Sequence, residues 1–562
     1  MSKVDSFFEA ISNNDLAKVQ ELIKPSFFSK GVNVNEQNKD GNTPLILALE
    51  KHNDEIVKIL IDKGSDVNTK NKVGKIPLII AYRSDLSGSL ELLIAKGANV
   101  DAKDQNGNTL LMLVLEHGRG VKKLSEMLIA KGADVNTIGQ DGKTPLILAL
   151  EKGYIEIAEF IIAEGANINV KTKNGKSPLI LALEKGYEEI AESFITKGVD
   201  VNSYELTDGF TPLHYASMNG YKNIVELLIS KGVGLDIVSF GHKEEKNNYN
   251  PDGYDSQTVN TWIEIVNAGY TPLNLSMKHK HDDIAKILIL NDADVNTKNM
   301  DNETPLYWAL KSNRKEIIEL LIENGADVNA KLEHVERFGS SNFHKSYTPL
   351  SLAVESGHED IIKLLIDKGA DVNAKFDHVN FVNKQYSETP LTIGVKKGNK
   401  NIVKLLIDKG AELNVFESDK TPLFLAMEKG YKEIVHLLID KGADISAIGH
   451  FRVRTSDISV LEFDGTLLEC AAVMGDEGLV KEFLKRKLKV KFQELEAAVM
   501  SGNLEIVQLM LSNYRERESE KIEKLIKQRE EYLNILTSYQ YISDNDKEKI
   551  ANLKLIIASL KK

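Results

Sequence analysis

Residues 143–169 read KTPLILALEKGYIEIAEFIIAEGANIN, and residues 176–202 read KSPLILALEKGYEEIAESFITKGVDVN, so the chain repeats one unit. Residues 42–68 carry the same pattern. The residue that opens each unit falls at Thr43, Ile76, Thr109, Thr144, Ser177 and Thr211, with successive steps of 33, 33, 35, 33 and 34 residues. The series continues at Thr271, Thr304, Thr348, Thr389, Thr421 and Thr466, which makes twelve recognisable units. A fixed period of this length indicates a repeat array rather than separate globular domains.

Each unit carries the signals of two short antiparallel helices. Thr43 can cap the first helix through its hydroxyl, and Pro44 suits the first helical position because no N–H is needed there. Apolar residues then recur at helical spacing in 45–49 and 56–61, and Gly64 ends the second helix. One such pair is too small to bury its apolar face alone, so we expect neighbouring pairs to stack into a curved solenoid.

A period of 33 residues with Thr-Pro-Leu at the start of a helix resembles the ankyrin repeat, and the resemblance covers nearly the whole chain. It implies an all-α repeat solenoid of stacked helix-turn-helix units joined by β-hairpin loops. We expect an N-terminal capping repeat at 1–38, repeats at 39–236, a loop insertion at 237–268, repeats with elongated hairpins at 269–489, a degenerate repeat at 490–512 and a helical cap at 513–562.

Two departures from the family pattern are informative. The family usually has a His after Thr-Pro-Leu whose ring bonds between repeats, and here only His214 fits. Apolar side chains replace it at Ile46, Ile147 and Ile180. Ile76 lacks the capping hydroxyl, and a polar, glycine-containing stretch stands where the turn between the helices of that unit belongs. We therefore expect the unit at 74–100 to be locally weak.

Four hairpin loops are elongated. The step from the Asp-Val-Asn triplet to the next Thr or Ser is 8 residues at Asn136 to Thr144. It is 35 from Asp236 to Thr271, 19 from Asn329 to Thr348, 16 from Asn373 to Thr389 and 20 from Ser446 to Thr466. Residues 447–465 alternate apolar and polar like two paired strands, whereas residues 237–268 are polar and turn-rich and predict a partly mobile loop.

The tail at 513–562 has apolar residues at helical intervals and predicts two amphipathic helices. Such helices can bind a membrane or dimerise. We favour a cap that shields the last apolar face of the array, which every repeat protein needs.

Composition narrows the class of protein. The 562 residues are 42% hydrophobic and 27% charged, which excludes disorder throughout. The net charge of −12 disfavours a nucleic-acid partner, because phosphate recognition starts from a positive surface. A single cysteine, Cys470, excludes an internal disulfide and indicates a reducing compartment. No apolar run is long enough to insert into a membrane. We expect a cytoplasmic protein, unless it is exported without a classical signal peptide.

Motifs for catalysis or for cofactors are weak. Gly142-Lys143-Thr144 and Gly175-Lys176-Ser177 imitate the end of a phosphate-binding loop, but Thr137 and Val170 stand where the loop glycine is required. His334, His344 and His378 lie in neighbouring hairpins, and His279 and His281 stand beside Asp282 and Asp283, yet no spacing is typical of metal ligands. We expect neither a metal nor a small-molecule cofactor.

Other reactive or charged residues also have a structural interpretation. Cys470 occupies a helical core position, so we interpret it as a small buried hydrophobe rather than a nucleophile. The basic cluster is made of Lys485, Arg486, Lys487, Lys489 and Lys491. It could be a nuclear signal or an anion-binding patch, but it closes a helix, where cations meet free carbonyl groups. In the family, asparagines such as Asn68, Asn136, Asn202, Asn296, Asn329 and Asn373 can be hydroxylated, but we assign them first to turn geometry.

The non-repeat segments, 237–268 and 513–562, are too small for a catalytic domain. The resemblance implies a non-catalytic scaffold that binds a partner protein through its groove and hairpins. The alternative is an inhibitor, immunity protein or effector secreted without a signal, acting on one enzyme. The repeated Glu-Lys pairs, such as Glu151 with Lys152 and Glu184 with Lys185, look like copies that have not diverged, so we place the partner site in the varied C-terminal half.

The predicted partner-binding residues are aromatic residues of the elongated loops and lysines of the adjoining helices. They are Trp262, Phe338, Phe343, Phe376, Phe381, Tyr386, Phe451, Lys311, Lys396 and Lys397. The competing interpretation is that successive hairpins pack on one another as a small extra sheet.

Overall fold

The computed structural model describes residues 2–25, 31–139, 141–247, 261–338, 341–379, 385–416, 420–454, 460–486, 488–514, 519–538 and 544–562. The chain forms two compact units, Met1–Asp294 and Val295–Lys562, which are described one after the other. Most of the described residues are helical, and the named strands lie in loops between helix pairs. The predicted all-α repeat solenoid is therefore confirmed.

The described residues of the first unit form eight helix pairs and one long hairpin. The pairs are α1 (Lys3–Ser12) with α2 (Leu16–Ile23), α3 (Pro44–Glu50) with α4 (Asp54–Asp62), α5 (Pro77–Arg83) with α6 (Ser87–Ala95), α7 (Leu110–His117) with α8 (Val121–Ala130), α9 (Pro145–Lys152) with α10 (Ile155–Ala163), α11 (Pro178–Lys185) with α12 (Glu188–Thr196), α13 (Pro212–Asn219) with α14 (Lys222–Ser230) and α15 (Pro272–Lys278) with α16 (Asp282–Leu290). Strands β1 (Phe240–Asn247) and β2 (Thr261–Ala268) lie between α14 and α15.

The second unit continues the pattern and ends in two longer helices. Its pairs are α17 (Pro305–Lys311) with α18 (Lys315–Glu323), α19 (Pro349–Ser356) with α20 (Glu359–Asp367), α21 (Pro390–Lys397) with α22 (Lys400–Asp408), α23 (Pro422–Glu428) with α24 (Lys432–Asp440), α25 (Leu467–Val473) with α26 (Glu477–Lys485) and α27 (Phe492–Ser501) with α28 (Leu504–Asn513). Its strands are β3 (Leu332–Phe338), β4 (Ser341–Tyr347), β5 (Phe376–Val379), β6 (Gln385–Glu388), β7 (Ile448–Arg454) and β8 (Val460–Thr466), and its last helices are α29 (Ser519–Ser538) and α30 (Asp544–Leu560).

The first helix of most units begins at a capped proline. The hydroxyl of Thr43 accepts a hydrogen bond from the backbone N–H of Ile46 at 3.2 Å, and Ser177 accepts one from Ile180 at the same distance. The proline that follows the cap has no N–H to leave unsatisfied. These caps fix where each helix starts, and thereby where the preceding hairpin ends.

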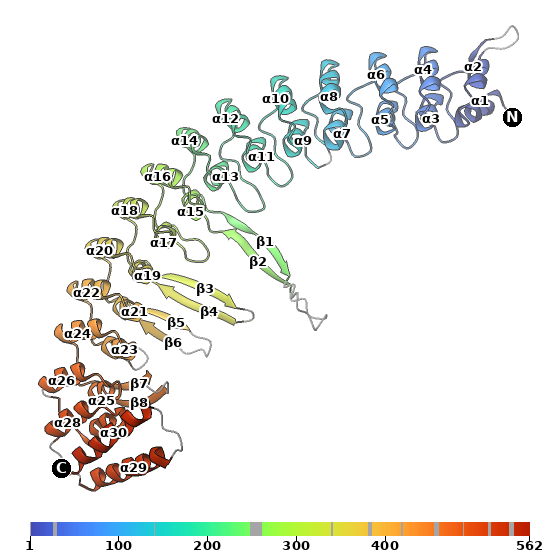
Figure 1. Cartoon of the computed structure of the whole chain (residues 1–562). Helices are drawn as coiled ribbons and strands as arrows, with labels where there is room; N and C mark the ends of the chain where they lie inside the picture. The colour runs from blue at the N-terminus through green and yellow to red at the C-terminus, as the bar shows by residue number, and fades with distance from the viewer. Residues whose placement is uncertain are drawn as a thin grey trace. The chain divides into compact units, whose positions relative to one another are not determined.

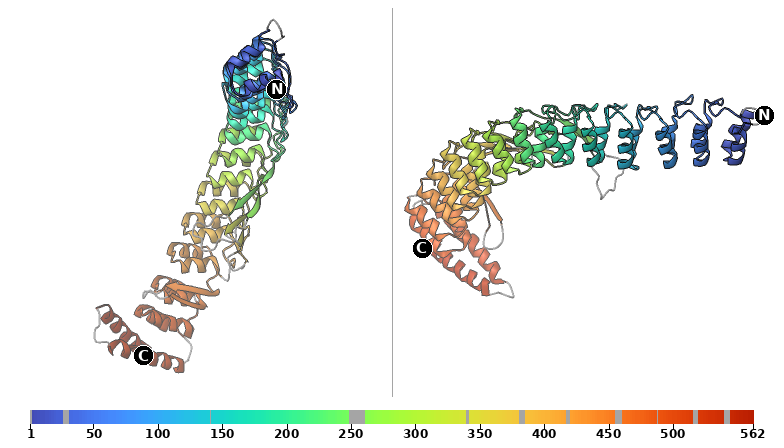
Figure 2. Two further views of the ribbon diagram at one scale, coloured as in Figure 1. Left: turned by 90° about the vertical axis from the view of Figure 1, so that its right-hand side faces the viewer. Right: turned by 90° about the horizontal axis from the view of Figure 1, so that it is seen from above.

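Stacking buries the apolar faces that one pair leaves open. Within each of the two compact units, the first helices of the pairs stand in one row and the second helices in another. The hairpins lie on the side of the first helices (Figures 1 and 2). The predicted core residues Leu45, Ala48 and Leu49 of α3 are fully buried, as are Ile56, Val57 and Leu60 of α4.

His214 makes the contact between repeats that the family pattern implies. Its Nε2 lies 3.1 Å from the carbonyl oxygen of Tyr270 in the next unit, and its Nδ1 lies 2.8 Å from the hydroxyl of Thr211. The ring is fully buried. Burial lowers the pKa of His214 to about 4, so the ring is neutral at pH 7.

The unit at 74–100 lacks caps at both helices. Neither Ile76 nor Leu86, the residues before α5 and α6, makes a side-chain cap hydrogen bond. The polar stretch forms the turn between the helices only in part: Ser84 and Asp85 make the turn. Ser87, Gly88 and Ser89 form the first turn of α6, because the buried hydroxyl of Ser89 hydrogen-bonds to Asp54 of the preceding unit.

The asparagine of most Asp-Val-Asn triplets bonds to the next repeat, with Asn202 as an exception among the described residues. Asn68 donates its amide N–H to the carbonyl oxygen of Gly97 at 3.2 Å and accepts the backbone N–H of Asn99 at 2.7 Å. The same donated bond recurs from Asn136 to Gly165, Asn296 to Gly325, Asn329 to Gly369 and Asn373 to Gly410. These side chains therefore do more than shape the turn. They also hydrogen-bond the backbone that follows the second helix of the next repeat.

The elongated loops contain antiparallel hairpins. The second and third hairpins join into one four-stranded sheet in the order β3-β4-β5-β6, where Lys345 of β4 pairs with His378 of β5. The hairpins β1-β2 and β7-β8 form two-stranded sheets of their own within the described residues. Packing of hairpin on hairpin therefore occurs for the second and third hairpins, and the two strands predicted for 447–465 are β7 and β8.

The loop at 237–268 contains a hairpin. Its two ends pair as β1 and β2, from Phe240 opposite Ala268 to Asn247 opposite Thr261. This pairing agrees with the expectation that the loop is one of four elongated hairpins, and Trp262, Ile263 and Ile265 favour strand despite the polar composition. Its centre, 248–260, lies outside the described residues.

The tail forms the two predicted helices. α30 contacts both α28 of the last repeat and α29, and its Ile556 and Ile557 are buried. Tyr532 and Ile535 of α29 remain about half exposed. The tail thus covers the apolar face of the last repeat.

Candidate functional site

The predicted aromatic residues lie in three separate sheets. Phe338, Phe343, Phe376 and Tyr386 belong to the four-stranded sheet, where Phe376 stands opposite Glu388 and Tyr386 opposite His378. Trp262 lies opposite Lys246 in β1-β2, and Phe451 lies opposite Phe463 in β7-β8. Phe381 lies outside the described residues. The fold therefore gathers four of the seven aromatic residues in one sheet.

The predicted lysines are engaged in contacts beside the hairpins. Lys311 donates to the hydroxyl of Tyr307 at 3.2 Å, and its ammonium lies 5.3 Å from the ring centre of Tyr307 and 5.4 Å from that of Trp308. Lys396 donates to Glu388 at the base of β6 at 2.8 Å. Lys396 thus joins a hairpin base to a first helix, whereas Lys311 contacts residues of its own helix α17 and Lys397 lies 4.0 Å from Glu355 of α19.

The same contact recurs along the row of first helices. The residue before the helix cap bonds the residue eight positions later, at the end of that helix, in Lys143–Glu151 and Lys176–Glu184, both at 2.7 Å. The pair Glu388–Lys396 is reversed in charge, and Tyr270–Lys278 replaces the carboxylate by a hydroxyl 2.9 Å from the ammonium. Exposed ion pairs contribute about 0–1 kcal/mol each, so this series shapes a surface more than it stabilises the fold.

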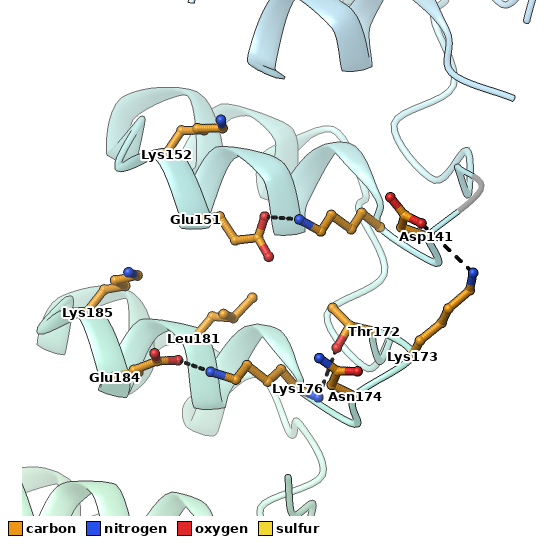
Figure 3. Close-up of a pocket in the computed structure, with 11 residues that line it drawn as sticks. Asp141, Glu151, Lys152, Thr172, Lys173, Asn174, Lys176, Leu181, Glu184 and Lys185 are labelled. Carbon is orange, nitrogen blue, oxygen red and sulfur yellow. Dashed lines mark hydrogen bonds and ion pairs between the residues drawn. The ribbon is translucent and has the colours of Figure 1, made fainter. Parts of the chain in front are cut away.

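A pocket lies between hairpins and helices of two consecutive repeats in the first unit (Figure 3). It is lined by Asp141, Lys143, Glu151, Lys152, Thr172, Lys173, Asn174, Lys176, Leu181, Glu184 and Lys185. The hydrogen bond to Glu151 raises the pKa of Lys143. Burial lowers the pKa of Lys176, but its pairing with Glu184 and Glu205 outweighs burial, and the pKa rises. Both ammonium groups stay charged. Glu-Lys pairs that look like undiverged copies in the sequence thus form the walls of a pocket.

Exposed apolar side chains concentrate in the loops between repeats. Fifteen large apolar side chains of the described residues are exposed, and ten of them lie in these loops, whereas the other five lie in helices. The ten are Val73, Ile138, Tyr204, Leu206, Ile237, Val238, Phe240, Met300, Phe416 and Ile448. None of the ten is among the residues predicted from the sequence, because the prediction was limited to a few aromatic residues of the elongated loops and to lysines of the adjoining helices. Apolar residues in otherwise polar loops were the signal that could have found them.

Two of these side chains are held in place by the preceding hairpin. The backbone N–H of Leu206 donates to the carbonyl oxygen of Asn174 at 2.9 Å, and that of Phe240 donates to Asp208 at 2.8 Å. Leu206 lies over Gly175, where a Cβ would come within 2.8 Å of its Cγ. The exposed fractions of Leu206 and Phe240, 56% and 54%, therefore follow from where the hydrogen-bonded hairpin backbone places these residues.

The strand pairing places two of the three hairpin histidines in one row. His334 and His378 both stand opposite Lys345, whereas His344 is one residue out of that row. The rings of His279 and His281 stack with centres 6.4 Å apart, but His281 Nε2 lies 3.0 Å from the carbonyl oxygen of Met218. Among the described residues, no group of three His, Cys, Asp or Glu residues is placed to hold a metal ion.

The remaining motifs take structural roles. Thr144 of the Gly-Lys-Thr motif caps α9 by accepting from Ile147. Cys470 is fully buried, and burial raises the pKa of its thiol. Arg486 of the basic cluster pairs with Glu482 at 2.7 Å and Asp440 at 3.1 Å, while Lys487 lies outside the described residues. Within the part of the chain that is described, no helix is both long and apolar enough to cross a bilayer.

Comparison with known families agrees with this geometry. The model described as "Ankyrin repeats (3 copies)" matches residues 7–104, 78–172, 161–239, 249–331 and 377–448. The model described as "Ankyrin repeat" matches residues 345–376. No curated protein matches the chain.

Proposed function

The chain belongs to the ankyrin repeat family, and we propose that it is a non-catalytic scaffold that binds a partner protein through its hairpins and the adjoining groove. Ankyrin repeats generally mediate protein–protein interaction and are typically not enzymes. The proposal adds a location to this general role.

The concentration of exposed apolar side chains in the hairpins carries the proposal. Surface residues of this kind are normal when scattered singly, but a series in one class of loop is typical of an interaction surface. Leu206 and Phe240 are fixed by backbone hydrogen bonds to the preceding hairpin, so a partner that covers them loses little conformational entropy. Aromatic side chains such as Phe416, which is 63% exposed, contribute strongly to binding once they are desolvated.

Affinity purification with the full chain, followed by mass spectrometry, identifies a partner, and variants of the chain then locate its site. We expect Leu206→Ser and Phe416→Ser each to weaken the purified complex at least tenfold, about 1.4 kcal/mol. Leu290→Ser is the matched control, because Leu290 is 68% exposed but lies at the end of a second helix. Equal weakening by all three variants, or by Leu290→Ser alone, would contradict a site on the hairpins.

A further inference from the structure

The pocket of Figure 3 is cationic in an acidic protein. Five lysines and three acidic residues line it, although the whole chain carries a net charge of −12. The lysines come from two consecutive hairpins and from the ends of α9 and α11. Leu181, which is buried, contributes apolar surface.

The acidic residues of the pocket are already held by lysines. Glu151 accepts from Lys143 and Glu184 accepts from Lys176, each at 2.7 Å. Asp141 lies 3.9 Å from Lys173. The ammonium of a lysine has three N–H donors, so Lys143 can bind a second carboxylate without releasing Glu151, whereas Lys176 already contacts Glu205 at 3.5 Å as well as Glu184.

Lys152 and Lys185 are the cations most available to a ligand. Both are exposed, and they occupy the same position at the end of successive first helices (Figure 3). Lys152 reaches Glu116 of the preceding repeat at 3.1 Å, with both side chains more than a third exposed. Lys185 forms no ion pair with any residue that the structure describes. The negative end of each helix dipole favours a cation here but does not neutralise it.

The spacing of these two lysines sets the spacing of a matching ligand. Packed helices lie about 8–10 Å apart, so equivalent positions of α9 and α11 are separated by about that distance. A peptide in the polyproline II conformation has three residues per turn and rises about 3.1 Å per residue, so side chains three residues apart lie on one side of the peptide and about 9 Å apart. A peptide that runs along the stack therefore presents every third side chain to successive repeats.

We propose that this pocket binds an extended acidic segment of a partner protein, with carboxylates at positions i and i+3 opposite Lys152 and Lys185. The pocket lies between the hairpins and the first helices and borders the exposed side chain of Leu206, so this inference rests on the function proposed above and names the chemistry of one partner segment. The charge of the chain as a whole repels a nucleic acid, whereas a short acidic peptide meets only the local charge of the pocket.

Fluorescence anisotropy with the full chain and labelled peptides tests the pocket. One peptide carries glutamates at every third position, and a second has the same composition with its glutamates adjacent. We expect the first peptide to bind at least fivefold more tightly, with an affinity that falls as salt is raised. Equal affinity for the two peptides would overturn the proposed spacing.

Matched variants test the two lysines. The double variant Lys152→Ala/Lys185→Ala is expected to bind the every-third-residue peptide at least tenfold more weakly. Lys131→Ala/Lys197→Ala is the control, because these lysines are exposed and follow the second helices α8 and α12 outside the pocket. A loss of similar size in the control, or tighter binding of a single-stranded oligonucleotide of equal charge, would overturn the proposal. Unchanged circular dichroism of both variants shows that the repeats stay folded.

Discussion

The side-chain amide of Asn136 donates a hydrogen bond to the carbonyl oxygen of Gly165, 3.2 Å away in the next repeat. The carbonyl of the same side chain accepts the backbone N–H of Asn167 at 2.7 Å. One side chain thus satisfies two backbone groups at the end of a neighbouring helix, where helices leave carbonyl groups without partners. Repetition of this contact couples each unit to its neighbour.

Asp101, directly after the unit at 74–100, stands where other units have the bonding asparagine. Its carboxylate accepts the backbone N–H of Asp134 at 2.8 Å, but it has no N–H to donate to Gly132. We expect Asp101→Asn to add the missing bond and to raise the free energy of unfolding by about 0.5–1.5 kcal/mol. Urea unfolding measures the change, and Asn136→Asp, which removes the same bond elsewhere, should lower stability. A stabilising effect of both changes would contradict this role.

The missing caps predict that the repeat at 74–100 unfolds locally more easily than the repeat at 143–169. Because neither helix of 74–100 has a side-chain cap, we expect its amides to exchange hydrogen faster than those of 143–169. Ile76→Thr should restore the cap that Thr43 provides in the preceding unit, with a stabilisation of about 0.5–2 kcal/mol. Hydrogen exchange followed by mass spectrometry checks both statements. The prediction is wrong if 74–100 ranks among the best-protected segments.

Buried His214 predicts a dependence of stability on pH. Its pKa is about 4 in the folded chain, against 6.5 as its ordinary value, so between these values the unfolded chain binds the extra proton. The contribution of neutral His214 to the free energy of unfolding is fully present above pH 6.5. It falls by up to about 3 kcal/mol as the pH drops towards 4.

Urea midpoints between pH 7 and pH 4 measure this loss. His214→Ile is the matched variant, because Ile46, Ile147 and Ile180 occupy the same position in other units. We expect the variant to lose less stability over this range than the natural chain. An identical pH profile for both proteins would show that His214 does not carry the effect.

Features set within one unit were predictable from the sequence. Of the contacts between units, the family resemblance implied only that of His214, and packing of hairpins on one another was one of two interpretations. Thr43 and Pro44 mark a helix start because the cap is local. The bond from Asn68 to Gly97 spans 29 residues and depends on stacking, so the sequence suggested only a turn. The pairing of Lys345 with His378 likewise requires two hairpins to lie side by side.

The candidate site shows the same limit. Aromatic residues in long loops drew attention to the C-terminal hairpins, but the exposure of Leu206 and Phe416 follows only from the folded hairpins. Lys176 and Glu184 belong to the repeated sequence pattern, and in the structure they pair and line a pocket. Lys176 stands just before the cap of α11 and Glu184 stands near the end of this short helix, so the two side chains meet on one face. The spacing of eight residues did not suggest this contact.

The affinity of a hairpin-trimmed chain for the purified partner tests the central claim most directly. The trimmed chain has the loops at 237–268, 330–347, 374–388 and 447–465 shortened to the 8-residue step between Asn136 and Thr144, a length at which other units stack, and it also carries Leu206→Ser and Phe416→Ser. The account predicts a loss of at least ~2 kcal/mol, about thirtyfold in Kd, with the helical signal intact. Unchanged affinity after trimming, together with a large loss from alanine at Glu151, Lys152, Glu184 and Lys185, would contradict the account and place the partner on the N-terminal groove.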